Sequence, residues 1–447
     1  MQPMERAAHL FQAGRWDEAE ALCHEIERTQ GGRHFYAWHL LSVIALHRGQ
    51  HEAAAEIATR ALALDPRHVD VLCNRGAALR NLGRYEEALA DYDSALAVDP
   101  MHGAAHNNRG VALAALNRYE DAQAAYEHAL AIDPRDDRAR FNRSLARLVA
   151  GDLRAGLPDF EARWTGSDTQ AGTRPMHAPQ WSGRESLAGN TILLHAEQGL
   201  GDSIQFARYV PQVAERGAIV ILETHGGLGP LLVQMPGVAR VIARGDPLPA
   251  HDFHCPLMSL ALAFGTTLDT IPNAVPYLRA PEAHLERWRS RLGPRERPRV
   301  GLAWSGSTTL RNDRNRSLAL AQLATLRELP FAFFSLQKEV RPGDAAALVT
   351  GPPIASFADE LADFRDTAAL VELMDLVISV DTALAHLAGA LAKPVWVLLP
   401  WSPDWRWLLE RDDSPWYPTA RLWRQAAPGD WSGVIDRIRA QMPRTLA

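Results

Sequence analysis

The sequence predicts a multidomain protein in which an all-α repeat array precedes an α/β region of two domains. Two observations lead to this prediction. Several small, aromatic and proline residues recur at one fixed interval over the first third of the chain. After residue 190 or so, short apolar runs alternate with helical patterns, which is typical of parallel sheets covered by helices. The length of 447 residues is enough for about three domains of average size.

Composition excludes several classes of protein. Hydrophobic residues make up 47% and charged residues 22%, as in an ordinary globular protein. The formal net charge of -6 argues against a dedicated nucleic-acid binder, which carries a basic surface. Cys23, Cys73 and Cys255 are far apart and lack metal-ligand spacing, which excludes a disulfide framework or a cysteine-rich zinc site and fits a reducing compartment.

The chain also lacks the signals of export and membrane insertion. Its first residues show no basic segment followed by an apolar core, so we expect no signal peptide. No uncharged apolar stretch reaches the length of about 18 residues that a membrane span needs. A cytoplasmic location is therefore expected.

The repeats are marked by Asp-Pro pairs at residues 65–66, 99–100 and 133–134, which are 34 residues apart. Proline cannot continue a helical hydrogen-bond ladder and restricts the residue before it, so each pair should end a helix. Turn and small residues fall on the same step: Gly49, Gly83, Asn117, Gly151, Ala54, Ala88 and Ala122. Small residues let antiparallel helices approach closely, so we expect stacked helix pairs.

This pattern resembles the tetratricopeptide repeat. Blocks 35–68, 69–102 and 103–136 align directly, a degenerate block precedes them, and a fifth decays after Gly151. The resemblance implies a concave face that binds a protein or peptide. Three asparagines at 34-residue steps on the first helices are candidate contacts: Asn74, Asn108 and Asn142. The alternative is that they bond only within or between helices.

The rest of the chain divides at two junctions. We predict a repeat array over 1–165, a linker over 166–189, and α/β domains over 190–285 and 296–447. Strands are expected at 191–196, 218–223, 238–243 and 253–257 in the first domain, and at 299–304, 331–336, 376–380 and 394–399 in the second. Ligands bind beyond the carboxyl ends of such strands.

The first candidate site is the turn Gly199-Leu200-Gly201-Asp202 between the first predicted strand and its helix. Its two glycines permit a tight turn, and the helix start offers N–H groups to a polar or anionic ligand. A dinucleotide fingerprint would need another glycine at the position of Ile204, so hydride transfer is not supported. Asp202 is either a general base on an acceptor hydroxyl or simply an N-cap.

The second candidate is the run from Ser379 to His386 at a strand-to-helix turn of the second domain. Asp381 or Thr382 would cap the helix, whose first N–H groups suit a diphosphate. His386 follows by about one helical turn and would lie on the same face. The alternative for His386 is an ordinary packed or solvated residue.

The third candidate is the loop of residues 304–309, which contains Ser305 and runs into Arg311, Arg314 and Arg316. Guanidinium groups match phosphate oxygens in pairs. Because the loop follows a strand, we favour phosphate contact over a solvated polar loop.

The C-terminal tail carries seven of the thirteen tryptophans: Trp396, Trp401, Trp405, Trp407, Trp416, Trp423 and Trp431. Indole rings can stack on a sugar or a base and donate an N–H. Most tryptophans pack in cores, so we expect one or two of these to touch a ligand, with Trp405 as the candidate.

Residues from about 190 to 440 resemble glycosyltransferases of the GT-B fold, most closely the bacterial lipopolysaccharide heptosyltransferase family. The matching features are Gly-x-Gly-Asp after the first strand and Ser-Val-Asp-Thr-x-x-x-His-Leu followed by Ala-x-x-x-Pro. The resemblance implies two Rossmann-like domains, an acceptor side followed by a nucleotide-sugar side. It makes Asp202 the catalytic base and assigns Asp381, Thr382 and His386 to the donor diphosphate. Where the family has a phosphate-binding lysine, this chain offers Arg314 or Arg316.

The order of domains resembles bacterial tetratricopeptide-repeat proteins with a glycosyltransferase-like region. The resemblance implies transfer of a sugar from a nucleotide-diphosphate sugar to an acceptor hydroxyl. No clustered carboxylate pair suggests a bound metal, so we expect transfer without a metal or another cofactor. The acceptor would be a protein or peptide held by the repeats. Two alternatives stay open: a scaffold whose transferase-like region is catalytically silent, and a sugar-nucleotide epimerase.

Overall fold

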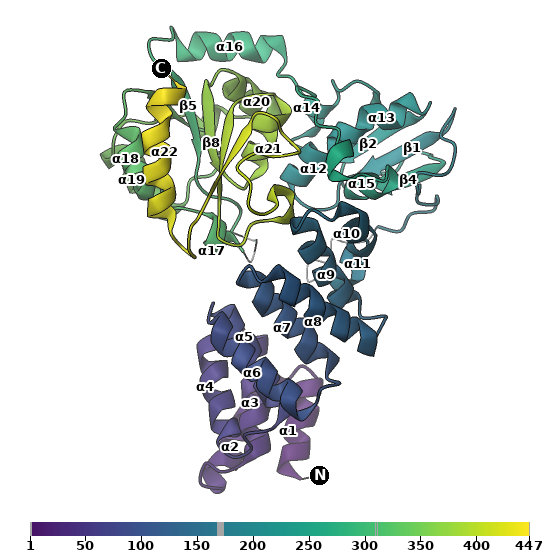
Figure 1. Ribbon diagram of the computed structural model, residues 1–447, viewed down its shortest axis with the longest axis vertical. Coiled ribbons are helices and arrows are strands. Elements are labelled where there is room, and N and C mark those ends of the chain that lie inside the picture. Colours follow the sequence, from purple (N-terminus) through teal and green to yellow (C-terminus); the bar gives the residue numbers. More distant parts are fainter. Residues whose placement is uncertain (1, 168–173, 309, 311, 447) are drawn as a thin grey trace. The chain divides into compact units, whose positions relative to one another are not determined.

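The computed structural model describes residues 2–167, 174–308, 310 and 312–446. The chain divides into two compact units. One comprises residues 1–147 with 159–168, and the other comprises residues 148–158 with 169–447. The first is helical and the second contains two parallel sheets (Figure 1). The four domain boundaries expected above stay predictions.

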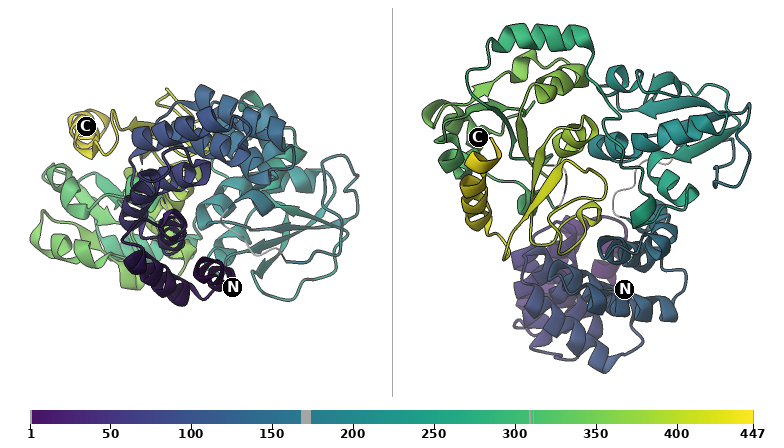
Figure 2. Two further views of the ribbon diagram at one scale, coloured as in Figure 1. Left: turned by 90° about the horizontal axis from the view of Figure 1, so that it is seen from below. Right: turned by 45° about the horizontal axis from the view of Figure 1, so that its top comes forward.

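Successive antiparallel helices make up the N-terminal part of the chain, residues 3–166, as Figures 1 and 2 show; within it, residues 148–158 group with the second unit. These helices are α1 (Pro3–Gln12), α2 (Trp16–Thr29), α3 (Phe35–His47), α4 (His51–Leu62), α5 (Val69–Asn81), α6 (Tyr85–Val98), α7 (Gly103–Ala115), α8 (Tyr119–Ile132), α9 (Asp137–Val149), α10 (Leu153–Phe160) and α11 (Arg163–Gly166). Each 34-residue block contains one pair, so the predicted helical solenoid is confirmed.

The periodic turn residues have a backbone reason. Gly49 and Gly83 have φ values of 71° and 80°, and Asn117 has 60°, so the first helix of each pair ends in a left-handed residue. The Asp-Pro pairs end the second helices as predicted. There the Asp99 carboxylate accepts the N–H of Met101 at 3.0 Å, which turns the chain toward the next helix.

A second periodic glycine makes room for a tyrosine inside each pair. A Cβ at Gly76 would lie 2.7 Å from Cε1 of Tyr92, and one at Gly110 would lie 2.5 Å from Cε1 of Tyr126. Both tyrosine rings are buried within an alanine-rich core. Close packing of helices therefore requires a residue without a side chain at these positions.

The first sheet of the C-terminal unit has four parallel strands in the order β3-β2-β1-β4. Its strands are β1 (Thr191–His195), β2 (Ile219–Thr224), β3 (Val238–Ala243) and β4 (Phe253–Pro256). The connecting helices are α12 (Leu200–Phe206), η1 (Ala207–Tyr209), α13 (Val210–Glu215), α14 (Gly229–Leu232), η2 (Leu257–Ser259), α15 (Leu260–Ala263) and η3 (Leu268–Thr270). All four strands agree with the sequence prediction within one or two residues.

The second sheet has six parallel strands in the order β10-β9-β8-β5-β6-β7. Its strands are β5 (Arg299–Ala303), β6 (Ala332–Ser335), β7 (Ala355–Ser356), β8 (Leu376–Val380), β9 (Val395–Leu399) and β10 (Ala420–Arg424). The accompanying helices are α16 (Glu282–Leu292), α17 (Asp313–Arg316), η4 (Leu320–Leu323), α18 (Ala324–Arg327), α19 (Pro342–Thr350), η5 (Ala358–Glu360), α20 (Phe364–Glu372), α21 (Ala383–Ala390), η6 (Trp405–Trp407) and α22 (Trp431–Thr445). The sequence does not predict the edge strands β7 and β10, because neither is a long apolar run.

Helices cover both faces of the second sheet (Figure 1). Helix α22 packs on one face with α18, while α20 and α21 lie on the face toward the first sheet. Strands β5, β8 and β9 are buried at every position, as expected of central parallel strands. These findings confirm the predicted fold class, an all-α solenoid followed by a GT-B-like α/β region. None of the helices in the described residues is long and apolar enough to cross a membrane.

Candidate functional site

The C-terminal unit contains a cavity of about 660 Å³ between its two sheets. Loops that follow strands β1, β2, β5, β6, β8 and β9 line it, so it lies at the carboxyl ends of both sheets, where α/β folds bind ligands. The ionisable side chains in the lining are Asp202, Arg316, Lys338, Glu339, Asp363, Asp381, His386, Asp404 and Arg406.

Asp202 enters the cavity from the first turn of α12. Its Oδ2 accepts the backbone N–H of Gly199 at 2.7 Å, which closes the turn after β1. Its Oδ1 accepts from Arg406, and the side chain is 19% exposed. Gly199, not Asp202, is the N-cap of α12; Asp202 is the third residue of the helix, and its carboxylate bonds back to the N-cap backbone and also faces the cavity. Its role as a general base stays a prediction.

Arg406 lines the cavity, and the sequence reasoning above missed it. It lies in η6, beyond the end of β9, and is only 6% exposed. Its Nε donates to Gln205 Oε1 at 2.8 Å and its Nη1 donates to Asp404 Oδ1 at 2.8 Å, while Nη2 donates to Asp202. Burial lowers the pKa of Arg406, but Asp404 and Asp202 outweigh this effect and raise it, so the guanidinium stays charged.

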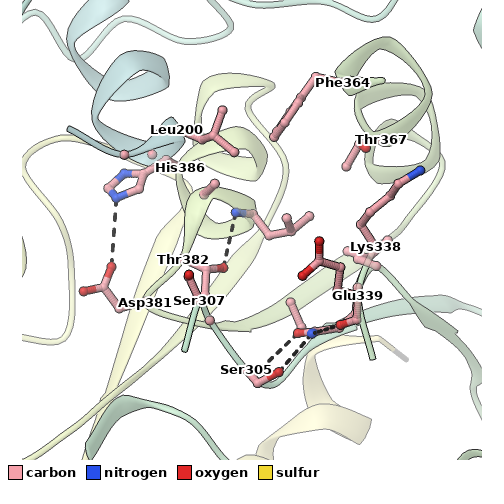
Figure 3. A pocket seen from close by; sticks show the side chains of 18 of the residues that line it. Leu200, Ser305, Ser307, Lys338, Glu339, Phe364, Thr367, Asp381, Thr382 and His386 are labelled. Carbon is pink, nitrogen blue, oxygen red and sulfur yellow. Dashed lines mark hydrogen bonds and ion pairs between the residues drawn. The ribbon is translucent and has the colours of Figure 1, made fainter. Parts of the chain in front are cut away.

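The turn after β8 presents Asp381, Thr382 and His386 to the cavity (Figure 3). The Thr382 hydroxyl caps α21 by accepting the N–H of Leu384 at 3.3 Å. Burial, and then the nearby Asp404 carboxylate, raises the pKa of Asp381 to about 6.

His386 is buried behind this turn as a neutral ring. Burial lowers its pKa well below the usual range, and Arg406 lowers it further. Its Nδ1 lies 3.0 Å from the Tyr417 hydroxyl, and its Nε2 lies 3.9 Å from Asp381 Oδ1. The ring also stacks on Trp407. His386 is therefore both packed and at the cavity wall.

Gly201 allows the first turns of α12 and α21 to meet. A Cβ at Gly201 would lie 2.8 Å from His386 Cδ2 and 3.5 Å from Ala383 Cα. The glycine in the Gly-x-Gly-Asp turn is thus required by contact between the two α/β domains. Gly199 and Gly201 also line the cavity, as the sequence predicts for a ligand-binding turn.

The loop after β5 is shaped by Gln337, which follows β6. Its Oε1 accepts the backbone N–H of Ser305 at 3.0 Å, and its Nε2 donates to the Ser305 hydroxyl at 3.0 Å. Arg316 then crosses this loop and donates from Nη1 to the backbone oxygen of Asp381 at 2.7 Å. The structure therefore brings Ser305, Arg316 and the Asp381 turn together.

Two further charged residues, Lys338 and Glu339, line the cavity but belong to no motif that the sequence would reveal. They follow β6 and lie across the cavity from His386, with Lys338 near Thr367, as Figure 3 shows. Lys338 Nζ donates to the backbone oxygen of Leu361. The family resemblance implies a basic group only after the first strand of the domain, whereas strand order places β6 directly beside β5.

Not every predicted residue belongs to this site. Trp405 is 4% exposed and does not line the cavity; its ring lies 4.7 Å from the Arg406 guanidinium carbon. Arg314 is exposed and is also absent from the lining. Thr309 and Arg311 lie outside the described residues. The structure thus favours Arg316 over Arg314 and gives Trp405 a supporting position behind Arg406.

The asparagine series in the repeats makes contacts between neighbouring helix pairs. Asn74 Nδ2 lies 3.3 Å from His39 Nε2, and Asn142 Nδ2 donates to Asn107 Oδ1 at 2.9 Å. Asn108 is half-buried on α7. The alternative of bonds between helices therefore applies to Asn74 and Asn142.

Comparison with known protein families matches both parts of the chain. Tetratricopeptide-repeat models match residues 4–68, 69–102 and 103–136. The model of glycosyltransferase family 9 (heptosyltransferase) matches residues 360–400, the segment that contains the Asp381 turn. Over these segments the chain is similar to tetratricopeptide-repeat proteins and to family 9 glycosyltransferases.

Among curated proteins, the chain is similar to Protein FlbA of Caulobacter vibrioides, with 27% identity over 327 residues. The alignment covers 65% of this chain and 52% of FlbA, so the chain spans about half the length of that relative.

Solved structures with similarity include a thermophilic tetratricopeptide-repeat protein of Thermus thermophilus, at 22% identity and a TM-score of 0.32. That match covers 37% of this chain and 91% of the other. MamA from Desulfovibrio magneticus RS-1 matches at 18% identity and a TM-score of 0.34, covering 38% of this chain and 94% of MamA. Scores this low carry no argument about function.

Proposed function

We propose that the C-terminal unit transfers a sugar from a nucleotide-diphosphate sugar to an acceptor hydroxyl. One observation carries this proposal: a single cavity joins the Asp202 carboxylate from one α/β domain to the Asp381 turn and Arg316 from the other. Glycosyl transfer needs a base that deprotonates the acceptor and positively charged groups that stabilise the leaving diphosphate. In this proposal one wall of the cavity supplies the base and the other supplies the positively charged groups.

The donor diphosphate would lie against the first turn of α21. The positive end of that helix, the hydroxyl of Thr382 and the guanidinium of Arg316 would offset the charge that develops on the leaving group. A neutral His386 can donate a hydrogen bond from Nε2 without a change of protonation near pH 7. In this proposal the protein itself supplies the positive charge, so chelators should leave the rate unchanged.

Asp202 would take the proton from the acceptor hydroxyl. Its Oδ2 accepts a hydrogen bond from Gly199 and its Oδ1 accepts one from Arg406, and a carboxylate oxygen has two lone pairs. Each oxygen can therefore accept a further hydrogen bond from an acceptor hydroxyl. Asp202 lies in the first turn of α12, after β1, in the domain that the family resemblance makes the acceptor side.

The repeats would hold a protein or peptide acceptor. Tetratricopeptide repeats commonly act in protein interaction, and the family models match the whole segment from residue 4 to residue 136. A tethered acceptor gains effective concentration near the active site.

The proposal is tested by incubating the full chain with ADP-, UDP-, GDP- and CDP-linked sugars and measuring released nucleotide. Asp202→Asn should lower the release rate by about 100-fold or more, because a general base is lost. Asp436→Asn, on the exposed face of α22, is the control and should leave the rate unchanged.

Two results would contradict transfer. If no donor is bound or cleaved, the scaffold alternative stands, and the repeats become the functional part of the chain. If the donor sugar changes configuration without release of nucleotide, the protein is a sugar-nucleotide epimerase instead.

A further inference from the structure

Arg406 joins the two walls of the cavity. Its side chain comes from the donor-side domain, but two of its three partners, Asp202 and Gln205, lie on α12 of the other domain. The third partner is Asp404, two residues earlier in the chain. A planar guanidinium with N–H groups in several directions can hold all three at once, whereas a lysine ammonium cannot.

The guanidinium is held rigidly. Its carbon lies 4.7 Å from the Trp405 ring centre and 5.8 Å from the Phe206 ring centre, and the side chain is 8% exposed. A buried charge is tolerated only where partners compensate it, so removal of one partner leaves an unpaired charge. The position of Arg406 is therefore determined by the same carboxylate that faces the cavity.

The consequence for Asp202 is geometric. Gly199 holds Oδ2 at 2.7 Å and Arg406 holds Oδ1, so the plane of the carboxylate is set from both sides. The Gly199 contact belongs to the α12 turn, whereas the Arg406 contact comes from the opposite domain. Without Arg406, rotation of the carboxylate about its last bond would be limited by one hydrogen bond alone.

We propose that Arg406 is a positioning residue for the transfer reaction: it orients the Asp202 carboxylate toward the acceptor. This inference rests on the proposed function, in which Asp202 is the base. It gives the glycosyltransferase a residue from the donor-side domain that controls the base on the acceptor side.

The test uses the full chain, with donor hydrolysis by water as the readout, so that no acceptor needs to be known. The probes are the same ADP-, UDP-, GDP- and CDP-linked sugars, with enzyme in excess over donor. Arg406→Met should lower the cleavage rate roughly 100-fold, the scale of loss from a misplaced catalytic group, with donor Kd changed less than about 3-fold.

A double-mutant cycle separates positioning from a general structural role. If Arg406 acts through Asp202, adding Arg406→Met to Asp202→Asn should lower the residual rate by less than about 3-fold. A multiplicative further loss, or complete loss of the residual rate, would overturn the inference. Arg411→Met is the matched control: this arginine of the same tail pairs with Asp413 and does not line the cavity.

Tryptophan emission and helicity show whether Arg406→Met folds. If it does not fold, a second variant tests the inference. Arg406→Lys keeps the charge but reaches fewer of the three partners, and we expect a loss of about 10-fold with folding retained. A folded Arg406→Lys protein with the wild-type rate would overturn the inference. If the wild-type chain neither binds nor cleaves any donor, the proposed function itself fails. The wild-type measurement therefore distinguishes failure of the proposed function from failure of this inference.

Discussion

At the residue scale, the site is a small set of charges whose partners come from different elements. Arg406 lies among Asp202, Asp404 and Asp381, and the last of these carries the raised pKa. Asp381 is 16% exposed in its side chain and lies beside another carboxylate, so its ionised form is disfavoured. A charged residue held in this way costs stability, which is common where a site is built for binding.

The raised pKa of Asp381 predicts a pH-dependent cost. The pKa of Asp381 is about 6 in the folded chain and 3.8 ordinarily, so the folded state binds its proton more tightly. The stability that this protonation contributes is fully present below about pH 4 and is lost as pH rises through 6. Asp381→Asn is neutral at every pH. It should therefore stabilise the C-terminal unit at pH 7.5 by about 1–3 kcal/mol, and by much less at pH 4.5.

This prediction is checked by urea unfolding followed through tryptophan emission, since ten of the thirteen tryptophans lie between residues 181 and 431. The contact from Arg316 goes to the backbone oxygen of Asp381, so the substitution leaves it in place. If Asp381→Asn changes the stability by the same amount at both pH values, the ionised form of Asp381 does not destabilise the fold. Asp436→Asn serves again as the exposed control.

At the element scale, each part of the chain depends on close approach between helices. In the repeats, Gly110 lets α7 meet the Tyr126 ring of α8. Between the α/β domains, Gly201 lets α12 meet α21 at His386. In both places a missing side chain, rather than backbone freedom, explains the glycine.

Gly110→Ala should therefore destabilise the repeats although alanine is the better helix former. The new Cβ would lie 2.5 Å from Tyr126 Cε1, and overpacking of this kind costs about 1–3 kcal/mol, more than the gain of about 1 kcal/mol in helix propensity. Thermal unfolding followed by helical circular dichroism measures the difference.

Gly103→Ala, on the same helix, is the matched control. Its Cβ would meet Ile132 Cγ2 at 3.7 Å, an ordinary contact, so the substitution should be neutral or slightly stabilising. Equal melting behaviour of the two variants would mean that the Tyr126 ring shifts at little cost.

At the scale of the whole molecule, the chain joins a solenoid to a two-sheet unit. Residues 148–158 group with the second unit, whereas residues 159–168 group with the first, so the division between them is not a single point in the sequence. The proposed activity and the proposed acceptor binding belong to different units. A substitution in one unit should therefore change the property that belongs to that unit and leave the other property unchanged.

Asn108 is the best place to test the repeats, because Asn74 and Asn142 already bond to neighbouring helix pairs. Asn108→Ala should raise the KM for a protein acceptor several-fold, by about 3- to 10-fold, and leave donor cleavage by water unchanged. The acceptor is found first by transfer of labelled sugar to total cell protein.

Ser94→Ala on α6 is the control, because its exposed hydroxyl donates to Ala90 of the same helix. Equal acceptor kinetics for both variants and the wild type would show that Asn108 does not contribute to acceptor binding. A change in donor cleavage would instead indicate a general loss of structure.

The sequence by itself determined the features that depend on local pattern. The 34-residue period predicted the helix pairs, and short apolar runs predicted the strands from β1 to β9, except the two-residue β7. The turns at Asp202 and Asp381 were found because parallel strands bring their carboxyl ends to one edge. Such signals lie within short stretches of chain, where periodicity and turn residues are informative.

Only the tertiary structure decided which side chains meet. Arg406 lies 204 residues from Asp202, and Lys338 enters the cavity because β6 pairs with β5, which brings the ends of these two strands side by side. Within α17, the structure also distinguishes Arg316, which lines the cavity, from Arg314, which does not. Burial, ion pairing and the raised pKa of Asp381 all follow from contacts between distant segments, and such contacts carry no periodic signal in the sequence.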